Sequence, residues 1–144
     1  MHDLTGQCLC GALRYRLDPT NAVVDYCHCK QCQRWSGAPV TAWAQVPAAQ
    51  FEIVSGAAKA FKSSARSQRH FCGACGSPTY MSGGDTIGIM LGTLDDASSL
   101  TPIGHGWTSD RISWFKIDDH LVLTGDVGVH GDFRGKLKYL IRFR

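Results

Sequence analysis

The chain has 144 residues, which suits one domain with an adequate hydrophobic core. Its 44% hydrophobic and 10% aromatic residues exclude a disordered chain, and no run approaches the roughly 18 apolar residues of a membrane span. The net charge is +3, but five of the 15 basic residues lie in the last eleven positions, and the other ten face 12 acidic residues. The body of the protein is therefore not a polycation, and we expect no nucleic-acid partner.

Short strand-like runs separated by turn-forming residues recur along the chain. They lie at 12–17, 40–46, 51–54, 58–61, 86–91, 112–117, 120–125 and 137–143. The nearly all-apolar run 86–91 is typical of a central strand. Strong helix formers are sparse, and the best helix candidates follow Cys29 and span 94–100. Short strands at this spacing predict a mainly β domain, sandwich-like or barrel-like.

All seven cysteines belong to groups, and none stands alone. The groups are Cys8 and Cys10; Cys27, Cys29 and Cys32; and Cys72 and Cys75. The N-terminal stretch MHDLTGQC lacks the apolar region of a signal peptide, so we expect a cytoplasmic protein. Thiols are kept reduced there, and clustered cysteines are more often metal ligands than disulfides.

Two of the groups, each followed by glycine, predict a structural zinc site. In a zinc knuckle two thiolates bind one ion, and a following glycine such as Gly76 permits the turn. A closed tetrahedral site needs four ligands. We therefore interpret the four cysteines of the two pairs as one site joining segments about 60 residues apart in sequence: Cys8, Cys10, Cys72 and Cys75. The alternative is two reduced or redox-active pairs.

The remaining group contains three cysteines, Cys27, Cys29 and Cys32. Three protein ligands and an open position are the arrangement of catalytic zinc, and a Cys₃ site favours a soft fourth ligand such as another thiolate. A thiol substrate is therefore the expected occupant. Spacing leaves two alternatives open. A different split could join Cys27 and Cys29 with Cys72 and Cys75, or a histidine could close the site. His28 is expected to point away, which leaves as histidine candidates His70, His105, His120 and His130.

The motifs GQCLCGALRYRL, YCHCKQCQRWSGAP, FKSSARSQRHFCGACGSP, LGTLDD and SWF, between Gly6 and Phe115, resemble the glutathione-dependent formaldehyde-activating enzyme (GFA) family, whose domain also occurs in centromere protein V. The resemblance includes every cysteine in order and local spacing. It implies a mainly β fold of the β-tent type in a GFA-type zinc-binding domain over 1–127. The basic extension 128–144 matches no motif of the family, and we expect it to form a strand packed on the same domain.

The resemblance also implies two zinc ions per chain, a structural one at Cys8, Cys10, Cys72 and Cys75 and a second one at Cys27, Cys29 and Cys32. The implied activity is that of a carbon–sulfur lyase acting on glutathione–aldehyde adducts, forming S-(hydroxymethyl)glutathione from formaldehyde and glutathione. Fold membership does not fix function. The alternative is a non-catalytic zinc-binding module for protein or nucleic-acid interaction.

The two carboxylates of glutathione need cationic or hydrogen-bonding partners near the three-cysteine group. The segment 53–84 contains four basic residues and no acidic one, so it could form a positive wall of the site. The candidate substrate contacts are Lys30, Arg34, Ser64, Arg66 and Arg69. Exposed surface charge is the alternative role of each cation, and a turn is the alternative role of Ser64.

Overall fold

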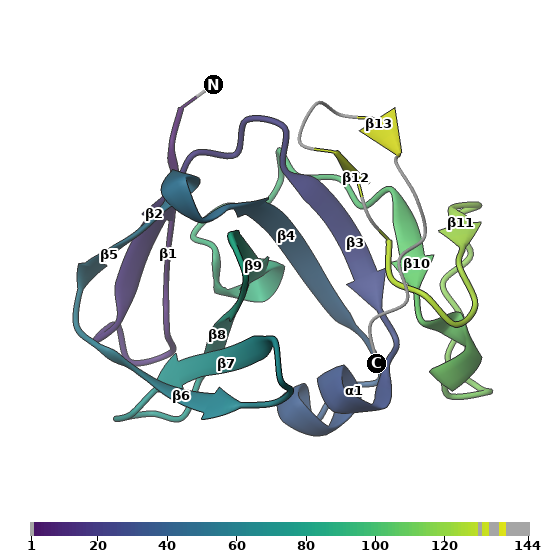
Figure 1. Cartoon of the computed structure of the whole chain (residues 1–144), viewed down its shortest axis with the longest axis horizontal. Coiled ribbons are helices and arrows are strands. Elements are labelled where there is room, and N and C mark those ends of the chain that lie inside the picture. The colour runs from purple at the N-terminus through teal and green to yellow at the C-terminus, as the bar shows by residue number, and fades with distance from the viewer. Residues whose placement is uncertain (1, 130, 133–135, 138–144) are drawn as a thin grey trace.

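The computed structural model describes residues 2–129, 131–132 and 136–137. In this part of the chain a small sheet and a large sheet lean against each other (Figure 1). The small sheet contains, in order, β1 (Leu4–Gln7), β2 (Arg14–Leu17) and β5 (Phe51–Ser55). All its neighbouring strands are antiparallel.

The large sheet forms the main wall of the molecule. Its order is β11 (Val122–Leu123), β10 (Gly104–Gly106), β3 (Val23–Cys27), β4 (Thr41–Pro47), β9 (Thr86–Met90), β8 (Pro78–Gly83), β7 (Ser67–Cys72) and β6 (Ala58–Lys62). Strand β10 pairs in parallel with β3 and β11, and the other pairs are antiparallel. A separate antiparallel pair contains β12 (Gly131–Asp132) and β13 (Lys136–Leu137).

Helical structure among the described residues is short. The helical elements are α1 (Lys30–Ser36) and the 3₁₀ turns η1 (Ala48–Gln50), η2 (Leu91–Thr93) and η3 (Thr108–Asp110). No helix in the described part of the chain is both long enough and apolar enough to span a membrane.

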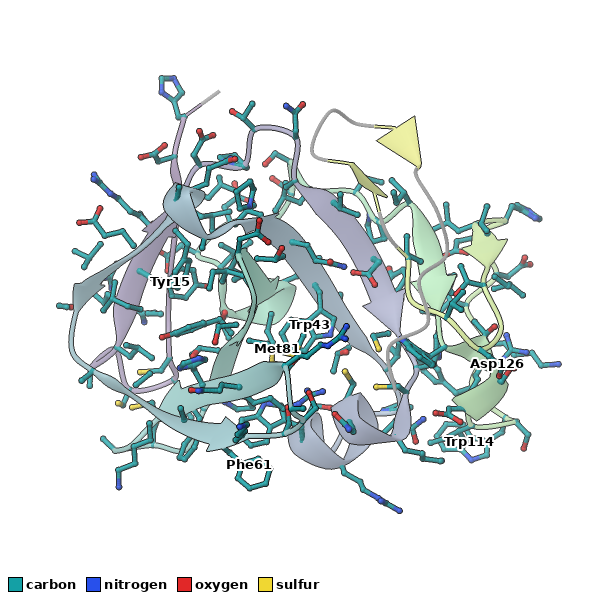
Figure 2. The ribbon with its side chains drawn as sticks, viewed as in Figure 1. Tyr15, Trp43, Phe61, Met81, Trp114 and Asp126 are labelled. Carbon is teal, nitrogen blue, oxygen red and sulfur yellow. The ribbon has the colours of Figure 1, made fainter. Side chains whose placement is uncertain are left out.

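The main core fills the space between the two sheets. Tyr15 and Leu17 from β2 pack there with Val46, Ile87 and Ile89 from the large sheet. All five side chains are at least nine-tenths buried. Figure 2 shows Tyr15 between the sheets. Side chains alternate between the two faces of a strand. The residues next to these core residues therefore point to the opposite face of the sheet.

The opposite face of the large sheet carries aromatic, sulfur-containing and cationic side chains. Trp43 pairs with Met90 across β4 and β9, and Arg69 pairs with Met81 across β7 and β8. Cys27 lies on the same face at the end of β3. Trp43 and Met81 lie close together in the middle of this face (Figure 2). The sheet therefore gives one face to the core and the other to a site.

The expected mainly β fold is confirmed, and so is the central position of β9, whose residues Ile87, Gly88 and Ile89 are all buried. The helix predicted after Cys29 is α1. The strand predicted at 112–117 is wrong, because the backbone turns there and Phe115 N donates to Ile112 O. Except for Leu137, the strand predicted at 137–143 lies outside the described residues.

The helix predicted at 94–100 is also wrong. The side chain of Asp96 accepts a hydrogen bond from the backbone N–H of Ser98 at 2.8 Å. Short polar side chains compete in this way with helical hydrogen bonds, and the segment forms turns instead.

Candidate metal centres

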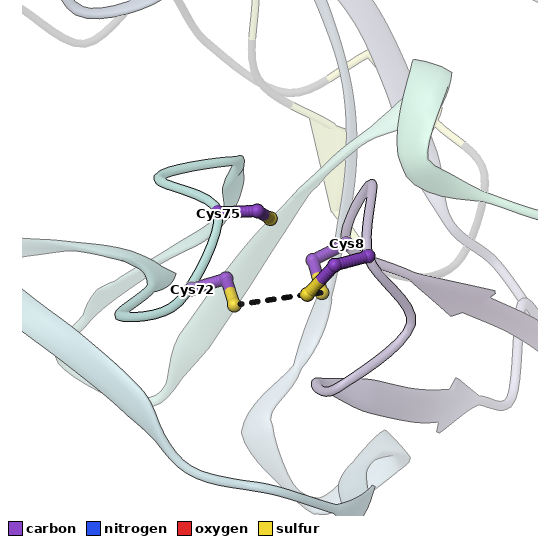
Figure 3. Close-up of side chains that lie close together, drawn as sticks. Cys8, Cys72 and Cys75 are labelled. Carbon is purple, nitrogen blue, oxygen red and sulfur yellow. Dashed lines mark hydrogen bonds between the residues drawn. The ribbon is translucent and has the colours of Figure 1, made fainter.

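The structure brings the two predicted cysteine pairs together at one end of the small sheet. Cys8 and Cys10 follow β1, Cys72 ends β7, and Cys75 lies in the turn after it. Figure 3 shows Cys8, Cys72 and Cys75 facing one another. The four sulfur atoms all lie within 4.8 Å of one another. Gly11 and Gly76 follow the two pairs with φ angles of 78° and 76°, a conformation that favours glycine. The predicted grouping of these four cysteines is confirmed.

This four-cysteine cluster fits a tetrahedral zinc ion. Sulfur atoms around zinc at a bond length of about 2.3 Å lie about 3.8 Å apart. The sulfurs of Cys8 and Cys10 are 3.6 Å apart, and those of Cys10 and Cys72 are 3.8 Å apart. Backbone N–H groups donate to the sulfurs of Cys8 and Cys72 at 3.3 and 3.4 Å. Such donors stabilise thiolates, the form in which cysteine binds metals.

The second cluster lies on the site face of the large sheet. Cys27 ends β3, Cys29 precedes α1 and Cys32 lies in its first turn, with the three sulfurs within 4.8 Å of one another. The sulfur of Cys29 accepts a hydrogen bond from the backbone N–H of Cys32 at 3.3 Å, so it caps the helix. Gly37 ends the helix with a φ angle of 71°. The cluster is therefore fixed by a strand end and a helix start.

The three thiols of this cluster share charge unequally. Hydrogen bonds from Cys27 and Cys29, with a further contribution from the positive charge of Arg69, hold the pKa of Cys32 far below its ordinary value. Hydrogen bonds with Cys29 and Cys32, together with burial, raise the pKa of Cys27. The three thiols therefore interact and titrate as one group.

An apolar collar surrounds the second cluster. Trp43 is 4% exposed and packs against the sulfurs, with Met81, Met90 and Trp107 partly buried around it. Cys29 is the most exposed cysteine of the three. The collar lowers the local dielectric and excludes water, which strengthens electrostatic interactions at the sulfurs.

No described histidine joins either cluster. His28 points away as predicted, because its Nε2 lies 2.9 Å from Nδ1 of His105. His105 in turn contacts Asp119 at 2.9 Å. Burial and the charge of His105 lower the pKa of His28 to about 4. His70 bonds to Ser82 and His120 is exposed, whereas the remaining candidate, His130, lies outside the described residues.

The predicted substrate contacts lie on two elements. Lys30 and Arg34 are exposed on α1. Ser64 and Arg66 belong to the turn between β6 and β7, where the Ser64 hydroxyl accepts hydrogen bonds from the backbone of Arg66 and Ser67. Arg69 is buried and points at Cys32. The helix and the hairpin meet through Arg69 and through the rings of Trp35 and Phe71, 5.6 Å apart.

Asp25 is a buried residue of this face that the sequence analysis did not single out. It is 5% exposed, accepts a hydrogen bond from Gln45 at 3.1 Å, and lies two residues before Cys27. Burial raises its pKa to about 7. The signal in the sequence is one carboxylate inside the mostly apolar run VVDYC. This run was not among the predicted strands.

A mainly β domain with two separate cysteine clusters in ligand geometry defines a class of thiolate-based metal-binding domains. Within that class, residues 3–110 match the model of the family described as glutathione-dependent formaldehyde-activating enzyme, and the chain belongs to this family. The resemblance seen in the sequence is thereby confirmed.

One solved structure supports the fold independently. A crystal structure of a protein from Rhodobacter sphaeroides, a structural genomics target, superposes with a TM-score of 0.55 and 22% sequence identity, covering 70% of this chain and 98% of that one. At this identity the likeness concerns the fold alone. No curated protein matches the sequence significantly.

Proposed function

We propose that this protein is a zinc-dependent enzyme that condenses glutathione with formaldehyde to S-(hydroxymethyl)glutathione, the reverse of a carbon–sulfur lyase reaction. In this proposal Cys8, Cys10, Cys72 and Cys75 hold a structural zinc ion, and Cys27, Cys29 and Cys32 hold the second one. Family membership supports the reaction class. We place the activity in the cytoplasm, where glutathione is abundant and thiols stay reduced.

The observation that carries the proposal is the three-membered cluster. Cys27, Cys29 and Cys32 converge, and within the described residues no further cysteine, histidine, aspartate or glutamate completes the group. Closed structural zinc sites have four protein ligands, whereas catalytic sites keep one position for water or substrate. The other cluster in the same chain has its full four ligands. The two clusters therefore support different roles.

The chemistry asked of the site is modest. When bound, zinc supplies a soft Lewis-acidic position that favours the deprotonated form of a substrate thiol. The three cysteines fix where that sulfur lies, and the collar of Trp43, Met81, Met90 and Trp107 excludes water around it. The substrate thiolate would attack the formaldehyde carbon, and the carbonyl oxygen would take up the proton that the thiol had lost, so the condensation balances. Proximity of the two reactants is the main requirement.

A polar cavity at the end of the β6–β7 hairpin supports a subsite for a substrate carboxylate. It has a volume of about 240 Å³, and its lining includes Lys62, Arg66, Ser67 and Ser82. Ser67 lies two residues from Arg69 on the same strand and the same face. Glutathione carries its carboxylates several bonds away from its sulfur. A cationic cavity outside the cluster, on the hairpin that carries Arg69, therefore suits this substrate.

The activity can be tested by exchange NMR of formaldehyde with glutathione, with metal content measured on the same sample. We expect two zinc ions per chain and an exchange rate above that of the protein-free mixture. A protein that holds both ions and leaves the exchange rate unchanged refutes the named reaction. A protein that holds a single ion refutes the proposed second site.

Replacing Arg66 with glutamine is expected to raise the half-saturating glutathione concentration about fivefold, because one exposed ion pair contributes up to about 1 kcal/mol. The rate at saturation should not change. The matched comparison uses 2-mercaptoethanol, a thiol without carboxylates, whose exchange should be the same in both proteins. Equal weakening for both thiols would show that Arg66 does not contact a carboxylate.

A further inference from the structure

A buried arginine lies against the three-cysteine cluster. Arg69 is 4% exposed. Its two terminal nitrogens, Nη1 and Nη2, each lie 3.7 Å from the sulfur of Cys32. Nη2 also donates to the side-chain oxygen of Gln31 at 3.3 Å. The guanidinium therefore sits between α1 and the site face of β7, with its charged end directed at a metal-ligand sulfur.

This guanidinium has no carboxylate partner in the described part of the chain. Every ion pair found there involves other residues. Arginine stays charged in proteins, and a buried charge is costly unless an opposite charge compensates it. Gln31 is neutral and cannot do so. The sulfur of Cys32 is the anionic group with which Arg69 is in contact.

We propose that Arg69 is a positioning residue that balances the charge of the three-thiolate metal site, an inference that rests on the proposed second ion. Three thiolates and one divalent cation sum to a charge of −1. The guanidinium brings the site to neutrality. When a substrate thiolate binds as fourth ligand, the site then carries −1 instead of −2. Arg69 thus favours both retention of the ion and acceptance of an anionic ligand.

This role differs from the carboxylate contact predicted from the sequence. A substrate carboxylate would need the charged end of Arg69 to be accessible, whereas that end is buried under Gln31 and Cys32. The exposed cation of the same hairpin, Arg66, stands at the polar cavity instead. The two arginines therefore have separable roles, one toward the sulfur and the other toward the rest of the substrate.

The test uses Co²⁺, whose thiolate charge-transfer absorption reports binding at cysteine sites. In the Arg69→Gln variant the affinity for the second Co²⁺ should fall about 10- to 100-fold, the usual cost of losing a group that supports a metal ligand. The Cys8, Cys10, Cys72 and Cys75 site is the internal control and should fill as in wild type. Arg16→Gln, which removes an exposed arginine paired with Glu52, should leave both affinities unchanged.

A second measurement separates charge from mere packing. At the Co²⁺-loaded second site, Arg69→Gln should weaken binding of the anionic 2-mercaptoethanol thiolate about tenfold or more relative to neutral imidazole. Arg69→Lys, which keeps the charge, should retain the preference for thiolate. The proposal would be overturned if Arg69→Gln kept the wild-type preference for thiolate over imidazole. It would also be overturned if Arg69→Lys lost as much of this preference as Arg69→Gln. If Arg69→Gln does not fold, the Arg69→Lys variant is compared with wild type. Retention of the thiolate preference supports the proposal, and its loss overturns it.

The wild-type titration distinguishes this proposal from the proposed function. A wild-type protein that binds a single Co²⁺ refutes the second site, and the charge-balancing role fails with it. A wild-type protein that binds two ions, with Arg69→Gln matching it in affinity and ligand preference, refutes the role of Arg69 alone.

Discussion

Replacing Cys72 with serine is expected to unfold most of the protein at room temperature. Cys72 is 2% exposed and packs with Cys8 and Leu13 in a small core at the base of the small sheet. The ion proposed for this cluster would join a hairpin near the N-terminus to the end of β7. Structural zinc contributes about 10–16 kcal/mol in small zinc-folded peptides, whereas whole domains are stable by about 5–15 kcal/mol. Loss of one ligand can therefore cost as much as the net stability.

Far-ultraviolet circular dichroism and thermal unfolding, with zinc content measured on the same samples, check this expectation. Wild-type protein treated with a strong chelator should show the same loss of structure, because the ion and its ligand act together. A Cys72→Ser protein that melts within a few degrees of wild type would contradict a structural role for this cluster. Gly73→Ala serves as a nearby control, since it changes the exposed turn without removing a ligand.

The two clusters could be predicted because the spacing of their cysteines is visible within short stretches of sequence. Each motif holds its cysteines within a few residues, and a turn glycine, Gly11 or Gly76, follows each of the two pairs in the four-cysteine cluster. The pairing of Cys8 and Cys10 with Cys72 and Cys75 could be inferred by counting ligands. The alternative split, which joins Cys27 and Cys29 with Cys72 and Cys75, is excluded by the observed grouping of the sulfurs.

The strands that the sequence analysis missed lack the local pattern that it searched for. In β3 the residues Val23, Val24 and Asp25 are all buried, because the strand is covered on both faces and does not alternate. In β7 the buried Arg69 reads as a surface residue. Strand β3 pairs with β10, which is distant in sequence, whereas β7 pairs with its chain neighbours β6 and β8 and is missed because its polar residues have little strand propensity.

The position of Arg69 could not be inferred from sequence for a related reason. Its contact with Cys32 joins residues 37 positions apart. Strand register places it opposite Met81, on the face that α1 covers. A basic residue in a basic segment is typical of a surface charge exposed to solvent or of a contact with an anionic substrate. Only the pairing of β7 with β8 and the packing of α1 show that its partner is a sulfur.

Replacing Cys29 with serine is expected to remove the second ion and abolish the acceleration of formaldehyde–glutathione exchange while the fold persists. Serine suits this position because Cys29 precedes α1 and its sulfur accepts a hydrogen bond from the backbone of Cys32. A serine oxygen is a favoured acceptor at a helix N-terminus. The substitution therefore removes a soft metal ligand and keeps the cap.

Cys29→Ala is the matched variant, since it removes both the ligand and the cap. It should lose exchange activity to the same extent, but it should be less stable than Cys29→Ser by about 1 kcal/mol in denaturant unfolding. Metal content should fall from two ions to one in both variants. Retention of wild-type exchange by Cys29→Ser would show that the reaction does not pass through this cluster. Equal stability of the two variants would instead show that the capping bond contributes little, with no bearing on catalysis. The pair thus separates the two roles of one sulfur, the helix cap seen in the structure and the proposed metal ligand.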